Sequence, residues 1–209
     1  MKVAIIGASG FIGAAVLDEA LSRGHEVTAI VRHPEKIKVS NPGLTVKKGD
    51  TTNEAELTEL LKGSEAVIVA YKTDDTAESV KATNALINAA RKDGIKRVLL
   101  VSGAASLEVA PGTLLIDTPQ FPAEWKNLAI ATKEALEVIK QANDLDWTAL
   151  SPAIMIEPGP RTGKFRLGTN QVVFNEKGES KISNADYAVA LIDELEHPQH
   201  IRQRFTLAY

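Results

Sequence analysis

The feature that most constrains this chain is a glycine-rich loop between an apolar run and a segment with helical spacing. The run Val3–Ile6 leads into Gly7-Ala8-Ser9-Gly10-Phe11-Ile12-Gly13, and Ile12–Arg23 follows with the periodicity of an amphipathic helix. Such a loop presents backbone N–H groups at the positive end of the helix dipole, where a diphosphate is stabilised. We therefore expect the loop to bind phosphate through Gly7, Ser9, Gly10, Phe11, Ile12 and Gly13.

Each glycine of this loop has its own expected role. Gly7 permits the tight turn, Gly10 lets the backbone approach the phosphates, and Gly13 lets the helix pack closely on the strand. The spacing G-x-x-G-x-x-G differs from the general dinucleotide-binding pattern G-x-G-x-x-G. The alternative is a tight strand-to-helix turn that binds no ligand, but the position of the loop after the first strand favours a dinucleotide.

Short apolar runs alternate with helical patterns along the first half of the chain. Runs such as Ala66–Val69 and Val98–Val101 are apolar at every position, as strands covered on both faces require. This rhythm predicts an α/β fold of the Rossmann type, with a doubly wound parallel sheet. The expected strands are Val3–Ile6, Val27–Val31, Leu44–Val46, Ala66–Ala70 and Arg97–Ser102, and the expected helices are Ile12–Arg23, Glu54–Leu61 with Asn53 as its cap, and Ala77–Lys92.

The second half of the chain is expected to supply the substrate side. The stretch 103–125 is rich in Pro and Gly and too long for a simple connection, so we expect it to cover a site. The segment 151–182, irregular over Ser151–Gly168, completes a small C-terminal substrate-side subregion. The other expected elements are a helix at Ala123–Ala142, a strand at Trp147–Leu150, a strand at Gln171–Phe174, a helix from a Ser183 or Asn184 cap to Glu196, and a closing strand at Arg204–Tyr209.

Length and composition fit a single domain over residues 1–209. The net charge of −3 provides no positive field that would favour nucleic acid. The absence of cysteine excludes disulfides, thiolate metal sites and cysteine nucleophiles. No apolar stretch approaches the roughly 20 residues of a membrane span. The N-terminus lacks a signal-peptide pattern, so we expect a cytoplasmic protein with no membrane partner.

The residues after the second expected strand favour one kind of dinucleotide. In NAD-binding versions of this unit, an acidic residue there accepts hydrogen bonds from the ribose hydroxyls. This chain has Arg32 followed by His33, and a guanidinium can pair with a 2′-phosphate that a carboxylate would repel. We therefore expect NADP(H) in preference to NAD(H). The alternative is a solvated basic turn, because Lys36 and Lys38 are also basic.

Further candidate residues follow the other strands. Asp50 could accept a hydrogen bond from the adenine amino group, or it could be an ordinary turn residue. Ala70 and Tyr71 end the fourth strand and Ser102 ends the fifth, at the edge where open α/β sheets bind ligands. We expect these residues to flank the nicotinamide half. Ser102 could hydrogen-bond the nicotinamide or the acceptor, or simply cap the backbone.

These phrases resemble the short-chain dehydrogenase/reductase superfamily in its extended or atypical branch. The loop Gly7–Gly13, the phrase Gly24–Arg32 and the pair Gly49-Asp50 are similar to the pattern of that branch. Ser151-Pro152-Ala153 and Ile182–Ala188 resemble late motifs of NADH-flavin reductase-like and NmrA-like proteins, the group to which biliverdin reductase B is related. The resemblance covers essentially the whole chain and implies a Rossmann-type fold with a nicotinamide cofactor.

One feature of the superfamily is missing from this sequence. The usual active site pairs a tyrosine with a lysine four residues later, and the lysine lowers the tyrosine pKa. Lys133 lies on the expected helix, but Ala129 stands four positions before it, and Pro122 stands at that spacing before Lys126. Ordinary alcohol–ketone chemistry is therefore not expected. Lys133 could still hold the ribose or phosphate, or be a solvated helical lysine.

The remaining candidates concern the acceptor. Pro152 and Ala153 are expected to back the nicotinamide, and Phe121 and Trp125 are candidate platforms for a flat acceptor, with core packing as the alternative. Ser102 and Lys133 are thus the expected catalytic residues. No histidines or carboxylates are paired at metal-ligand spacing, so no metal site is expected.

Three functions are compatible with these residues. The first is an NAD(P)H-dependent reductase that transfers a hydride to a flavin, a quinone-like compound or another conjugated acceptor. Such an acceptor needs chiefly to stack near the nicotinamide, so it demands little of side chains. The second is a non-catalytic NADP(H)-binding redox sensor, and the third is an NAD(P)-dependent epimerase or isomerase. The expected partner is a small molecule, and both a monomer and a homodimer remain open.

Overall fold

A computed structural model describes all residues, Met1–Tyr209, and contains a central eight-stranded sheet. The strand order is β10-β12-β8-β5-β4-β1-β2-β3, and every neighbouring pair is parallel except β10 with β12. The chain therefore starts in the middle of the sheet and extends it first to one side and then to the other. The strands are β1 Lys2–Ile6, β2 Glu26–Val31, β3 Leu44–Lys48, β4 Ala66–Val69, β5 Arg97–Val101, β8 Asp146–Ser151, β10 Arg166–Gly168 and β12 Gln203–Ala208.

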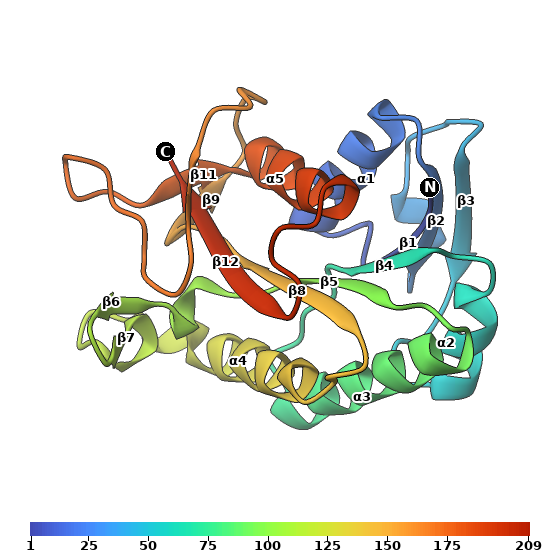
Figure 1. The fold of residues 1–209 in the computed structure, drawn as a ribbon, viewed down its shortest axis with the longest axis horizontal. Helices are drawn as coiled ribbons and strands as arrows, with labels where there is room; N and C mark the ends of the chain where they lie inside the picture. Colours follow the sequence, from blue (N-terminus) through green and yellow to red (C-terminus); the bar gives the residue numbers. More distant parts are fainter.

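Helices cover both faces of the sheet, as Figure 1 shows, with α1 and α5 on one face and α2, α3 and α4 on the other. Their bounds are α1 Phe11–Ser22, α2 Glu54–Leu61, α3 Thr76–Lys92, α4 Lys126–Lys140 and α5 Asn184–Glu196. Asn53, Asp75 and Ser183 cap α2, α3 and α5, each accepting a backbone N–H three residues ahead. The predicted α/β, doubly wound Rossmann-type fold is confirmed, as is the capping role of Asn53.

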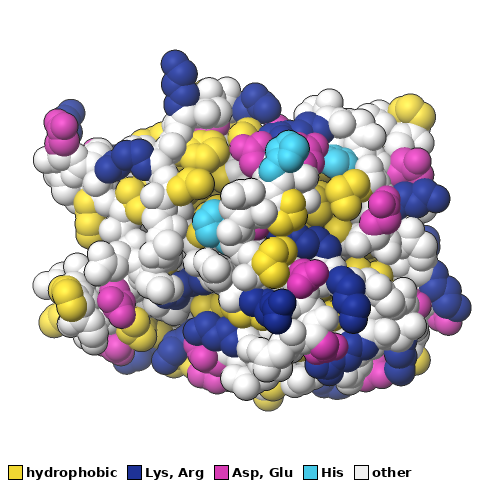
Figure 2. Space-filling model, in the orientation of Figure 1, with side chains coloured by type: hydrophobic (Ala, Val, Ile, Leu, Met, Phe, Trp, Pro, Cys, Tyr) yellow, Lys and Arg dark blue, Asp and Glu magenta, His cyan; other side chains and the backbone are white.

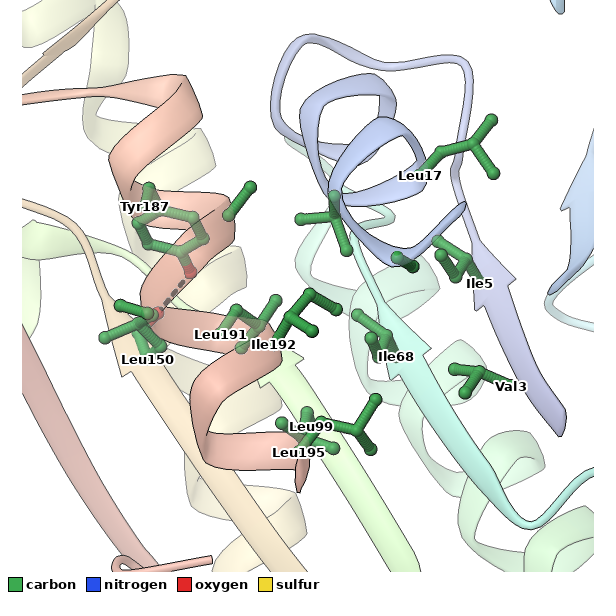
Figure 3. Packing of buried hydrophobic residues seen from close by; sticks show 14 of the residues in the cluster. Val3, Ile5, Leu17, Ile68, Leu99, Leu150, Tyr187, Leu191, Ile192 and Leu195 are labelled. Atoms are coloured by element: carbon green, nitrogen blue, oxygen red, sulfur yellow. Dashed lines mark hydrogen bonds between the residues drawn. The ribbon is translucent and has the colours of Figure 1, made fainter. Parts of the chain in front are cut away.

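The core consists of one apolar layer on each face of the sheet. The layer under α1 and α5 includes Ile5, Ile68 and Leu99, and Figure 3 shows these side chains meeting Leu17 and Leu191 of the two helices. The opposite layer packs the alternate strand residues against α2, α3 and α4. Apolar residues at consecutive positions of β4 are all buried, which is why the strand sequences show no alternation.

Two small sheets lie beside the carboxyl edge of the main sheet. The hairpin β6 (Glu108–Ala110) and β7 (Thr113–Leu114) forms within the expected covering loop, between the short 3₁₀ helices Ala104–Ser106 and Leu115–Asp117. The strands β9 (Met155–Glu157) and β11 (Lys181–Ser183) pair in parallel. The expected helix at 123–142 begins as a 3₁₀ turn, Ala123–Trp125, before α4.

The predicted strand at Gln171–Phe174 is wrong. In this segment, only Gln171 forms an isolated bridge, to Glu108, and β10 occupies the place beside β12. Val172 is buried and donates its N–H to the Glu108 carbonyl at 2.9 Å. Tertiary contact with the covering loop therefore overrides the β propensity of the segment. The stretch expected to be irregular, Ser151–Gly168, instead contains β9 and β10.

Candidate functional site

The glycine loop joins β1 to α1 in a conformation that requires glycine at two positions. Gly7 has a φ of 81°, and a Cβ there would lie 2.8 Å from the carbonyl carbon and oxygen of Ala70 at the end of β4. At Gly13, a Cβ would overlap the Gly7 carbonyl oxygen. At Gly10, a Cβ would meet the same oxygen at 3.3 Å, and Gly10 is the N-cap of α1. The turn and the close helix approach expected from the sequence are both present.

The loop leaves several backbone donors free at the start of α1. The Gly10 N–H donates to Gly7 at 3.0 Å and the Ala14 N–H donates to Gly10 at 2.8 Å. The amides of Ser9, Phe11, Ile12 and Gly13 have no acceptor within the chain, and no acidic side chain lies in the first turn of α1. Free amides at the positive end of a helix of 12 residues fit an anion such as a diphosphate.

Arg32 is exposed immediately after β2 and forms no ion pair. Its guanidinium carbon lies 5.9 Å from the centre of the Tyr71 ring. His33, the next residue, is also exposed, with Nδ1 3.2 Å from a carboxylate oxygen of Glu35. The guanidinium donors of Arg32 are therefore available to a ligand. Tyr71, expected from the sequence to flank the nicotinamide half, has its ring next to Arg32.

Tyr71 is fixed by hydrogen bonds at the start of α3. Its hydroxyl donates to Glu78 at 2.6 Å, and the Thr73 hydroxyl donates to the other Glu78 oxygen at 2.8 Å. Burial raises the pKa of Tyr71 to about 12, and the hydrogen bond to Glu78 adds to this effect. The same hydrogen bond lowers the pKa of Glu78. The pair is therefore a neutral phenol and a carboxylate at neutral pH.

Asp50 forms a local turn at the end of β3. One carboxylate oxygen accepts both the Thr52 N–H at 2.8 Å and the Thr52 hydroxyl at 2.9 Å. These bonds lower the pKa of Asp50. The turn role considered for Asp50 is thus observed, and its other carboxylate oxygen makes no hydrogen bond within the chain.

A row of buried hydroxyls crosses the carboxyl edge of β5, β8 and β12. Ser102 donates its N–H to Leu150 at 2.9 Å, next to Ser151, and Ser151 is the register partner of Thr206. All three side-chain oxygens are buried without a hydrogen-bond partner. The sequence pointed to Ser102 alone, because β12 could not be placed beside β8 from local signals. Buried hydroxyls without partners are uncommon, so this row is an unusual feature of the edge.

Lys133 lies on α4, close to the segment that follows Ser102. A Cβ on Gly103 would meet the Thr132 methyl group at 3.2 Å, so this part of α4 contacts the end of β5. Lys133 itself is half-buried and makes no ion pair. Pro152 and Ala153 are buried directly after β8. Phe121 is half-buried, whereas Trp125 is 51% exposed and therefore is not a core residue.

None of the three tyrosines is free to act as a proton donor. Tyr71 donates to Glu78, and Tyr187 is fully buried and donates to the Leu150 carbonyl at 2.7 Å, a bond drawn in Figure 3. Tyr209 donates to Asp186 at 2.7 Å. The absence of a Tyr-Lys pair in the sequence is thus matched by the placement of every tyrosine.

Sequence reasoning missed the anchor of the substrate-side segment. Asp186 accepts hydrogen bonds from the Thr162 hydroxyl and amide, the Gly163 amide and the Tyr209 hydroxyl. Burial raises the pKa of Asp186, but these hydrogen bonds outweigh burial, so its pKa is lowered overall. Arg161 pairs with Glu19 of α1 at 2.8 Å. These contacts join residues 161–163 to α5 and to the helix that begins at the glycine loop.

Comparison with known proteins identifies the family. A model described as NAD(P)H-binding matches residues 7–198. The chain belongs to this NAD(P)H-binding family. An uncharacterized Bacillus subtilis protein, YwnB, is 44% identical over 213 residues, covering 99% of this chain and 98% of its own length. The resemblance to the atypical branch of the short-chain dehydrogenase/reductase superfamily is confirmed.

Two solved structures are similar to the whole chain. A protein from Bacteroides thetaiotaomicron, provisionally named an epimerase, is 45% identical with a TM-score of 0.95, covering 100% of this chain and 96% of that one. A protein from Streptococcus pneumoniae, provisionally named an NADH-flavin reductase, is 37% identical with a TM-score of 0.84, covering 100% and 99%. These findings support a general NAD(P)-dependent oxidoreductase with a nicotinamide cofactor.

Surface charge, metal-ligand arrangements and helix length bear on other kinds of function. Basic and acidic side chains are interspersed over the face shown in Figure 2. No group of three or more His, Asp or Glu side chains has the arrangement of a metal site. None of the helices has the length and apolar character needed to span a bilayer.

Proposed function

We propose that the chain is an NADPH-dependent reductase that transfers a hydride to a conjugated acceptor such as a flavin or a quinone. The family match supports the coarser class of NAD(P)-dependent oxidoreductase. The finer proposal rests on one observation, that each of the three tyrosines is hydrogen-bonded elsewhere. A site without a Tyr-Lys pair suits an acceptor whose protonation can come from solvent or from a weak local donor.

The residues at the carboxyl edge fit the cofactor. The free amides of Ser9, Phe11, Ile12 and Gly13 would donate to the diphosphate. Arg32, which has no ion pair to break, would bind the 2′-phosphate with two parallel hydrogen bonds. Asp50 would accept the adenine amino group through its second oxygen, His33 would border the adenosine half, and Ala70 would flank the nicotinamide half.

The residues around Ser102 would hold the acceptor. The bound cofactor supplies the hydride. The Ser102 hydroxyl has no partner within the chain and would donate to an acceptor atom that gains charge. Pro152 and Ala153 would form an apolar wall, Lys133 would contact the ribose or phosphate, and the exposed Trp125 ring offers a flat surface for a conjugated ring.

Loss of NADPH absorbance in the presence of FMN, FAD or a quinone tests this function. Saturable oxidation with at least one acceptor is the expected result. Tight NADPH binding without turnover would refute the reductase and support the redox sensor, to which the missing Tyr-Lys pair is equally suited. Isomerisation of a sugar substrate without net NADPH consumption would instead support the epimerase.

Cofactor preference is tested separately by binding. Dissociation constants for NADPH and NADH are compared in the native chain and in Arg32→Ala. A bidentate charge-assisted contact contributes roughly 1.5–3 kcal/mol, so the variant should lose about tenfold or more in NADPH affinity. Equal affinities of the native chain for NADPH and NADH would refute the role given to Arg32.

A further inference from the structure

The environment of Arg32 explains why its guanidinium is free. The carboxylates of Asp50 and Glu78 interact electrostatically with this guanidinium but form no ion pair with it. Hydrogen bonds from Thr52 lower the pKa of Asp50, and the charges of Lys81 and Arg32 add to this effect. Hydrogen bonds from Tyr71 and Thr73 lower the pKa of Glu78, and the charge of Arg32 adds to it. Arg32 is thus attracted to both acids, yet neither lies within ion-pair distance.

The Tyr71 ring is an alternative partner for the Arg32 guanidinium, in competition with the carboxylates of Asp50 and Glu78. The guanidinium carbon of Arg32 lies 5.9 Å from the ring centre, within the range of a cation–π contact. A contact with the ring face engages the charge of a guanidinium without consuming its N–H donors. An ion pair with Asp50 or Glu78 would consume the same donors that a 2′-phosphate requires.

Glu78 is itself occupied by neutral donors. The Tyr71 and Thr73 hydroxyls each donate to one of its two oxygens, at 2.6 Å and 2.8 Å. These bonds fix the orientation of the ring and use lone pairs that Arg32 would otherwise find. Tyr71 is half-buried, so the ring has little freedom to turn away.

We propose that Tyr71, held by Glu78, is a positioning residue that keeps Arg32 free for the 2′-phosphate and thereby sets the preference for NADPH over NADH. This inference rests on the proposed role of Arg32 in the cofactor site. It assigns to Tyr71 a task distinct from contact with the nicotinamide. The preference is then a property of the pair, because Arg32 without the ring would be drawn to a neighbouring acid.

A double-mutant cycle measures this coupling. The ratio of NADPH to NADH affinity is determined by titration calorimetry for the native chain, Tyr71→Leu, Arg32→Ala and the double variant. Tyr71→Leu should lower the ratio about two- to fivefold, as expected for an exposed cation–π contact. In the Arg32→Ala background, the same substitution should leave the ratio unchanged, because the group that it positions is gone.

Two further variants keep the test decisive. Tyr71→Phe retains the ring but frees one Glu78 oxygen, so its ratio should lie between the native value and that of the ring-free variants, and Tyr71→Gln is a second ring-free variant should Tyr71→Leu fold poorly. A native ratio preserved in the ring-free variants, or an equal drop in the Arg32→Ala background, would overturn the positioning role alone. A native chain without NADPH preference would overturn the role of Arg32 first, and this inference with it.

Discussion

Gly7 provides the sharpest test of how the glycine loop is built. A methyl group added at Gly7 meets two separate costs. Its φ of 81° lies in the left-handed region, which costs an L-residue about 1–2 kcal/mol. The new Cβ would also stand 2.8 Å from the carbonyl carbon and oxygen of Ala70 and 2.9 Å from the Tyr71 nitrogen. These are backbone atoms directly after β4 and cannot move aside as a flexible side chain would.

Gly24 is the matched control for this substitution. It has nearly the same φ, 79°, but a Cβ there has no heavy atom within 4 Å. Gly24→Ala should therefore cost only the left-handed conformation, about 1–2 kcal/mol. Gly7→Ala should cost that amount plus about 1–3 kcal/mol for overpacking. For a chain of this size, the difference corresponds to about 2–12 °C in Tm.

Urea denaturation and NADPH titration of Gly7→Ala and Gly24→Ala test this predicted difference. Gly24→Ala should bind NADPH like the native chain, because it lies at the far end of α1 from the loop. Gly7→Ala should bind more weakly, since relief of the overlap shifts the turn that presents the amides. Equal stability of the two variants within about 0.5 kcal/mol, or native NADPH affinity in Gly7→Ala, would refute the close approach of this loop to β4.

The other predictions concern Asp186 and Ser102. Asp186→Asn should destabilise the chain by about 1–3 kcal/mol near neutral pH, because it replaces an acceptor of several donors. The folded pKa of Asp186 is lowered, so its contribution is present above about pH 4 and is lost as the pH falls through the folded pKa. Urea unfolding at several pH values should show the gap between variant and native chain narrowing in acid; a constant gap contradicts this. Ser102→Ala should be as stable as the native chain, because its hydroxyl has no partner. It should oxidise NADPH about tenfold more slowly with FMN if the hydroxyl stabilises charge on the acceptor, and native rates would remove that role.

The parts of the fold with strong local signals could be read from the sequence. The glycine loop, the continuously apolar strands and the Asn53 cap each depend on residues within one or two turns of chain. Helix α5 also begins directly after Ser183, one of the two residues expected to cap it. In these places local preference and tertiary structure agree, so one sequence suffices.

The failures involve contacts between distant residues. Gln171–Phe174 has strand composition, yet its main partner is Glu108, more than sixty positions earlier in the chain. The anchoring of residues 161–163 by Asp186 gave no signal beyond an acid in the first turn of a helix. The contact of the Tyr71 ring with Arg32 was not anticipated, because the direction of this side chain depends on Glu78 and Arg32. No single-sequence pattern reports which of several nearby partners a side chain selects.

The anchors missed by sequence analysis connect the two halves of the proposed site. Glu19 lies on α1, two turns after the free amides, and pairs with Arg23, the residue directly after α1, and with Arg161 of the substrate-side segment. Residues 162 and 163 are tied to Asp186 and, through the Tyr209 hydroxyl, to the end of the chain. The helix that presents amides to the diphosphate and the segment beyond β9 are therefore held by one continuous set of bonds. Under the proposed reductase function, a substrate-side segment fixed in this way to α1 would position a flat acceptor without a further catalytic pair, because the fold supplies the positioning.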